Sequence, residues 1–249
     1  MSISTVLWLV GLFAALVLVN RWLTEVLHRV GFLFFGGDEG AVVLFCILLL
    51  PGVVLHECSH WLAATLLDVP TKGMTLLPHI RKGGEVQLGS VNVRRSDAVR
   101  ESLIGLAPLL IGAITILLLA RWRLQVSLPQ PFNAGVLLRA LVDSLQSPDA
   151  LVWLYVLFAV SNAMLPSESD RQPWLPVLVF TGLLAAAVYL SGLVRQVPAS
   201  VRDWLATGAA YITFVFALAV AVDIPVLLFL LVLEKAGDVL LQRKVEYRD

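Results

Sequence analysis

The segment Leu55–His60, LHECSH, places two imidazoles and a carboxylate inside an apolar stretch of the chain. His56 and His60 are four residues apart, so on a helix they lie on one face and can reach a single metal ion. Glu57 lies beside that face, where its carboxylate can act on a water molecule instead of binding the metal. Two histidines, one carboxylate and an open position for water are typical of catalytic zinc sites. The spacing therefore predicts a hydrolytic zinc centre.

The alternative interpretation is that these polar side chains occur together by chance. Ionisable side chains inside a membrane span cost free energy and by default indicate function. The chain has four histidines, and two of them are in this segment. Metal binding would also offset the cost of burying them, so we favour the metal site.

The composition indicates that these residues lie in a membrane. Of the 249 residues, 59% are hydrophobic and 14% are charged, values far from those of an average soluble domain. The formal net charge is zero, which gives no argument for a nucleic-acid partner. Cys46 and Cys58 are twelve residues apart on one expected helix, too far for a disulfide.

Six apolar segments could span a membrane, for which roughly 20 residues are required. The first has no charged segment before it and no small-x-small cleavage site after it, so we interpret it as a retained helix and not as a signal peptide. The six segments are residues 3–19, 40–67, 102–120, 149–166, 174–194 and 204–222. The expected fold is an all-α polytopic membrane protein with about six transmembrane helices and a small β-strand loop after the second.

The segments between these spans are also informative. Residues 68–101 are the most polar stretch and predict short strands joined at 81–84, with a bulge or turn near residues 89–90. Residues 132–145 have apolar side chains at helical spacing, which indicates an interfacial helix. Asp223 followed by Ile-Pro is typical of a helix N-cap. Whether the chain after it extends the sixth span or lies at the interface stays open.

The topology restricts where a third zinc ligand can lie. The second and fourth spans run in the same direction, so the end of the fourth lies on the side of the histidines. That end reads SNAMLPSESD, in which Asp170 is the favoured ligand and Glu168 its rival. Pro166 can break the helix and turn the chain back toward the depth of His56.

HECSH on a membrane helix, followed over 100 residues later by SNAMLPSESD, resembles the site-2 protease family of intramembrane zinc metalloproteases. That family has HExxH on one core helix and an Asp ligand two spans later, usually with an Asn about eight residues earlier. Asn162 and Asp170 have this spacing. The family usually has Gly after the Asp, whereas Arg171 follows here, so the chain resembles a divergent member. The resemblance covers mainly residues 40–175.

The resemblance implies a function for each of these residues. His56, His60 and Asp170 would bind Zn2+, Glu57 would be the general base, and Asn162 would hold the substrate backbone or the oxyanion. The implied substrate is a transmembrane protein or peptide in the lipid bilayer. The family is also thought to unwind its substrate by pairing it with a strand edge, and the strands of 68–101 could provide that edge.

The sequence is also compared with what two other classes of function would require. A catalytically degenerate family member could act as a membrane scaffold or binding module, but the intact Glu57 argues against it because metal retention alone would not require that residue. A metal transporter would need polar groups along several spans, and the third, fourth and fifth spans are too apolar. The oligomeric state is not predicted.

We divide the chain into three parts on this basis. Residues 1–39 form the first transmembrane helix and its connector, residues 40–175 the metalloprotease core, and residues 176–249 the C-terminal transmembrane helices and an amphipathic tail. With six spans, the side that carries loop 68–101 has 11 of the 18 Lys and Arg residues. The positive-inside bias therefore predicts that this loop, both termini and the active site lie toward the cytoplasm.

Labelling can test this orientation. Single cysteines placed at Thr71 and Thr75, in a chain whose native cysteines are replaced, should react with an impermeant maleimide only after the membrane is permeabilised. Equal labelling in intact cells would contradict the predicted orientation.

Overall fold

The computed structural model describes residues 3–76, 79–80, 86–87, 89–126, 133–193 and 197–241. Most of these residues are helical, and the strands follow the second helix, so the predicted all-α membrane fold is confirmed. The elements are α1 (Ile3–Phe35), α2 (Asp38–Leu66), β1 (Thr71–Thr75), β2 (His79–Ile80), β3 (Val86–Gln87), β4 (Ser90–Val93), α3 (Ala98–Trp122), α4 (Ala134–Ser144), α5 (Ala150–Ala163), α6 (Glu168–Arg171), α7 (Trp174–Leu190) and α8 (Ala199–Leu241).

The number of helices that could span a membrane is smaller than the six expected. Within the described residues, α1, α2, α3 and α8 are each long and apolar enough. The expected fourth span corresponds to α5, and the expected fifth span corresponds to α6 and α7. The chain bends by 54° at the short break between α5 and α6, and the helices on the two sides of this break could together count as a fifth span. At 1.5 Å per residue, α5 is roughly 21 Å long, which is short of the roughly 30 Å hydrocarbon layer.

Helix α8 is longer than expected and passes through the predicted helix start. It contains Asp223 and Pro225 in its interior, so the prediction that Asp223 is an N-cap is wrong. The carboxylate instead accepts hydrogen bonds from side chains of α5, which are distant in sequence. Residues 224–241 therefore extend the sixth expected span. The chain beyond Leu241 lies outside the described residues.

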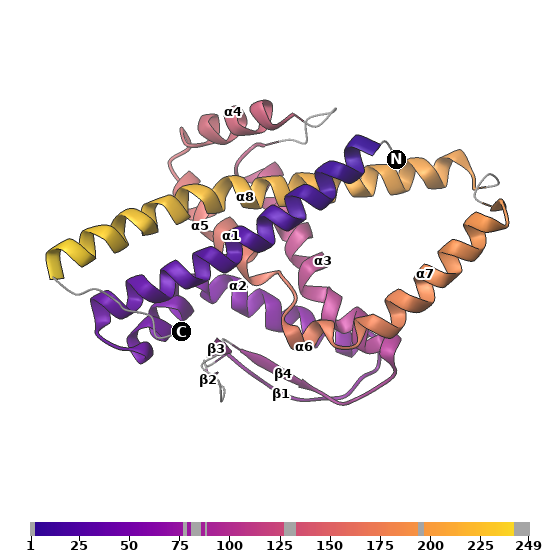
Figure 1. Cartoon of the computed structure of the whole chain (residues 1–249), viewed down its shortest axis with the longest axis horizontal. Helices are drawn as coiled ribbons and strands as arrows, with labels where there is room; N and C mark the ends of the chain where they lie inside the picture. The colour runs from indigo at the N-terminus through magenta and orange to yellow at the C-terminus, as the bar shows by residue number, and fades with distance from the viewer. Residues whose placement is uncertain are drawn as a thin grey trace.

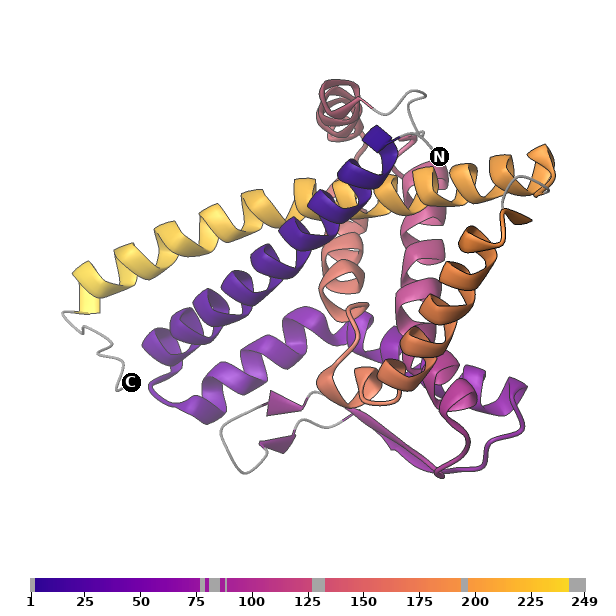
Figure 2. The same ribbon diagram turned by 45° about the vertical axis from the view of Figure 1, so that its right-hand side comes forward.

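The outer helices α1 and α8 run side by side (Figure 1). Arg29 of α1 and Glu234 of α8 form an ion pair, with Nε and Oε1 2.7 Å apart. The strands β1 and β4 lie at the opposite end of the molecule from α4, with α3 and α5 between them (Figure 2). Helix α4 corresponds to the predicted interfacial helix.

The strands after α2 form two antiparallel pairs, β1 with β4 and β2 with β3. The register of β1 and β4 is shifted between Thr71 and Met74, so the irregularity lies in β1. The predicted joint at 81–84 lies outside the described residues. After β4, Asp97 caps α3 by accepting from the backbone N–H of Arg100 and of Val99. These bonds hold the pKa of Asp97 below its usual value.

Helices α2 and α5 approach each other closely at Gly52. A Cβ at this position would overlap the carbonyl oxygen of Ala159. The preceding Pro51 has no N–H, so it leaves the carbonyl of Ile47 without its helical partner. That carbonyl accepts a hydrogen bond from the Tyr155 hydroxyl of α5, with an O···O distance of 3.3 Å. The Pro51-Gly52 pair therefore joins α2, which carries the histidines, to α5.

We expect Gly52→Val to destabilise the protein by about 1–3 kcal/mol, the usual cost of overpacking a tight contact. Gly11→Val in α1 is the matched control, because no atom lies within 4 Å of a Cβ there. Thermal unfolding in detergent, followed by circular dichroism, measures the difference. Equal losses in the two variants would show that the α2–α5 contact is not tight.

Candidate metal centre

His56 and His60 of α2 direct their Nε2 atoms toward each other. The two Nε2 atoms are 3.0 Å apart, and the rings meet edge to face with centroids 4.7 Å apart. His60 is buried and His56 is half-buried. The helical spacing of four residues thus gives the predicted result, two imidazole nitrogens at one point.

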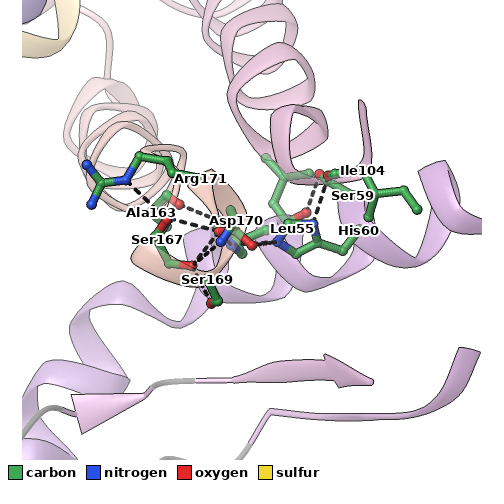
Figure 3. Close-up of polar contacts among 10 residues, drawn as sticks. Leu55, Ser59, His60, Ile104, Ala163, Ser167, Ser169, Asp170 and Arg171 are labelled. Carbon is green, nitrogen blue, oxygen red and sulfur yellow. Dashed lines mark hydrogen bonds and ion pairs between the residues drawn. The ribbon is translucent and has the colours of Figure 1, made fainter. Parts of the chain in front are cut away.

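Asp170 reaches the same point from α6. The chain leaves α5 after Ala163, passes Pro166 and forms the short helix that contains Asp170. The Asp170 carboxylate lies 3.3 Å from Nε2 of His60 and 3.6 Å from Nε2 of His56. The ligand atoms of the three residues lie within 4.8 Å of one another, and Figure 3 shows Asp170 facing His60.

The first turn of α6 fixes the Asp170 carboxylate. Ser167 caps this helix, and its backbone N–H and hydroxyl donate to Oδ2 of Asp170 at 2.8 and 2.6 Å. Arg171 donates from Nε to the Ser167 carbonyl at 3.2 Å (Figure 3). Glu168, the rival ligand from the sequence, is exposed and lies outside the cluster.

Backbone carbonyls fix the tautomers of both imidazoles. Nδ1 of His56 lies 2.6 Å from the Ala163 carbonyl oxygen, and Nδ1 of His60 lies 2.9 Å from the Ile104 carbonyl oxygen. A carbonyl only accepts, so each Nδ1 carries the proton and donates. In the neutral imidazole Nε2 is then an unprotonated acceptor, which is the form that binds a metal.

Both carbonyls are available because the helices that carry them lack a donor at that point. Pro108 lies four residues after Ile104 in α3 and has no N–H, so Ile104 has no helical partner. Ala163 is the last residue of α5, where carbonyls lose their helical donors. Two irregularities in α3 and α5 therefore orient the two histidines.

The donor set fits a zinc ion. Two imidazole nitrogens and a carboxylate face one another, and three acceptors at this distance repel unless a proton or a metal cation lies between them. Ligand atoms about 2.0–2.1 Å from a tetrahedral zinc ion are about 3.3 Å apart. The two Nε2 atoms are 3.0 Å apart, Oδ1 of Asp170 lies 3.3 Å from Nε2 of His60, and Oδ2 lies 3.6 Å from Nε2 of His56, all close to this value. His56, His60 and Asp170 could therefore hold zinc and leave the fourth position to water.

Glu57 is buried next to the cluster but is not part of it. Its carboxylate is directed toward the chain at the start of β4, where a Cβ on Gly89 would lie 2.9 Å from Oε1. The backbone of Val91 in β4 also interacts with the carboxylate. Because Gly89 has no side chain, β4 can approach Glu57 closely.

Asn162 lies one residue before Ala163, and the structure does not bring its amide into the cluster. Nδ2 donates to the Phe158 carbonyl at 2.8 Å and to Asp223 at 2.9 Å, while Oδ1 accepts from Asn20 at 2.9 Å. Asn20 and the contact of Asp223 were not predicted from the sequence. Both are polar residues in apolar surroundings, which is the signal that could have identified them.

Comparison of the chain with known protein families, curated proteins and solved structures finds no match. The resemblance to the site-2 proteases therefore rests on the residues of the two motifs. The geometry of the cluster is an independent observation about the same residues.

We expect Gly105→Ala in α3 to weaken zinc binding by about 10- to 100-fold, the usual cost of disturbing the support of a ligand. A Cβ on Gly105 would overlap the carbonyl oxygen of Asp170 and displace α6. Gly182→Ala in α7 is the matched control, since no atom lies within 4 Å of a Cβ there. Competition with a chelating dye measures the affinity. Unchanged binding in Gly105→Ala would show that α3 does not position Asp170.

Proposed function

We propose that this protein is an intramembrane zinc metalloprotease that hydrolyses a peptide bond in or near a transmembrane segment of a membrane-protein substrate. One observation carries the proposal. His56, His60 and Asp170 direct three metal-binding atoms to one point between helices of a multi-pass membrane protein. The buried Glu57 beside them supplies a base. A protein that only retained a metal would not need this carboxylate.

Three of the residues would bind the metal, and the fourth, Glu57, transfers the proton. His56, His60 and Asp170 would hold zinc, which when bound supplies a Lewis acid that polarises the scissile carbonyl and makes water more acidic. Glu57 accepts a proton from the water that attacks the carbonyl carbon. As the C–N bond breaks, Glu57 donates that proton to the leaving amine, so the base is regenerated. The products are a carboxylic acid and an amine, and transfer of the second water proton from the acid to the amine gives the carboxylate and the ammonium ion.

Strand β4 supports this proposal. A peptide bond inside a helix is a poor substrate because its amide groups are bonded within the helix, so a membrane substrate must be unwound. β4 pairs with β1 along one edge and lies against α2, with Gly89 in contact with Glu57. An extended substrate segment added to this small sheet would present its backbone close to the base.

We also propose a protein family and the side of the membrane on which the active site lies. The residues of both motifs support membership of the site-2 protease family as a divergent member. The six Lys and Arg residues of loop 68–101 support an active site toward the cytoplasm. The competing proposal, a catalytically degenerate family member that acts as a scaffold, differs in one observable respect. A scaffold could bind zinc, but it would cleave nothing.

The test compares the wild type with Glu57→Gln. We expect both proteins to bind about one zinc per chain, because Glu57 is not a ligand, and only the wild type to cleave. Elemental analysis of protein purified in detergent measures the zinc. Mass spectrometry of new N-termini in isolated membranes measures cleavage within transmembrane segments. If both proteins bind zinc and the new N-termini in the two membranes are identical, the result would favour the scaffold.

The carboxylates of α6 provide the matched control for the ligand set. Asp170→Ala should lose zinc and cleavage together, because two histidines alone hold the ion poorly. Glu168→Ala should keep both, since the Glu168 side chain is exposed outside the cluster. Zinc loss in Glu168→Ala alone would show that the ligand assignment is wrong.

A further inference from the structure

Asp223 lies in the interior of α8 and is completely buried. Its Oδ1 accepts from Asn162 Nδ2 at 2.9 Å and from Ser161 Oγ at 3.3 Å. Its Oδ2 has no hydrogen-bond partner among the residues that the structure describes. A buried carboxylate in a membrane helix is costly, and an acceptor left unpaired adds to that cost. The carboxylate is therefore expected to have a role.

The hydrogen bonds of Asp223 lead to the end of α5. Asn162 is held from the opposite side by Asn20 of α1, whose Nδ2 donates to the side-chain oxygen of Asn162 at 2.9 Å and to its backbone oxygen at 3.2 Å. One residue of α5 is thus bound by α1 and α8 together. This arrangement leaves the last turn of α5 little freedom to rotate or unwind.

The last turn of α5 in turn orients one of the histidines. Ala163 follows Asn162 and is the residue whose carbonyl accepts from Nδ1 of His56 at 2.6 Å. A terminal carbonyl has no helical donor, so its direction depends on how the end of the helix is held. The path from Asp223 to His56 therefore consists of one side-chain hydrogen bond, one peptide unit and one further hydrogen bond.

We propose that Asp223 is a positioning residue of the metal centre, which acts as a hydrogen-bond acceptor for Asn162 and so holds the Ala163 carbonyl against His56. The inference rests on the proposed function, since it assigns Asp223 a part in the zinc site of that function. Asp223 does not touch the three candidate ligands and is not itself a ligand. Its effect passes through the end of α5.

Zinc affinity of the full chain in detergent tests the proposal, by competition with a chelating dye. We expect Asp223→Ala to bind zinc roughly tenfold more weakly, as for other residues that support a ligand. Asp223→Asn should stay within about twofold of the wild type, because its amide oxygen can accept the same two hydrogen bonds. Asp238→Ala, on the same helix and away from α5, is the matched control. A loss in Asp223→Asn as large as in Asp223→Ala would overturn the acceptor role.

A double-mutant cycle shows whether the effect passes through His56. In a chain that already carries His56→Ala, Asp223→Ala should cause no further loss of zinc affinity. Additive losses would overturn the proposal and would indicate a general loss of structure. Should Asp223→Ala not fold, Asn20→Ala releases Asn162 from α1 and should weaken zinc binding in the same direction. Unchanged affinity in that variant would also overturn it.

The outcomes separate this inference from the proposed function. Zinc binding that is equal in the wild type and in Asp223→Ala overturns the inference and leaves the metalloprotease proposal intact. A wild type that binds no zinc overturns the proposed function and the inference together.

Discussion

The interior of a membrane contains no water, so each polar atom placed there must find its partner within the protein. In this chain two interruptions of helical hydrogen bonding meet that requirement for the histidines. Pro108 leaves the Ile104 carbonyl without a donor, and the end of α5 leaves the Ala163 carbonyl without one. Each carbonyl accepts from Nδ1 of one imidazole. The same bonds that satisfy the backbone therefore direct both Nε2 lone pairs to one point.

The bend between α5 and α7 depends on local hydrogen bonds of the same kind. The short helix α6 is closed by Ser167, which caps it, and by Arg171, which donates to the Ser167 carbonyl. Site-2 proteases usually have glycine at the position of Arg171. Here the longer Arg171 side chain fixes the turn that holds the Asp170 carboxylate at the cluster.

The second buried polar group connects the outer helices to the centre of the molecule. Asn20, Asn162 and Asp223 come from α1, α5 and α8, and their side chains are bonded to one another. The long helices α1 and α8 thus hold the end of α5 from two sides. Hydrogen bonds of this kind in membrane proteins contribute on the order of 1 kcal/mol each, so their main effect is to fix orientation.

The sequence by itself determined the features that depend on neighbouring residues. The apolar segments predicted a helical membrane protein, the alternation in 68–101 predicted strands, and the four-residue spacing of His56 and His60 placed two imidazoles on one face. Topology and Pro166 favoured Asp170 over Glu168 but left both open. These inferences succeeded because helix and strand periodicity is a local property of the chain.

Only the tertiary structure decided which distant groups meet. The turn of α6 directs Asp170 to the histidines and leaves Glu168 exposed. The continuation of α8 through Asp223 could not be predicted from the sequence either. The side chains that donate hydrogen bonds to its carboxylate lie 61 and 62 residues away on α5. The Asp-x-Pro pattern predicts a cap in which the carboxylate accepts from backbone N–H groups of its own helix. In the folded protein the Asp223 carboxylate accepts from side chains of α5 instead, and α8 continues through this residue.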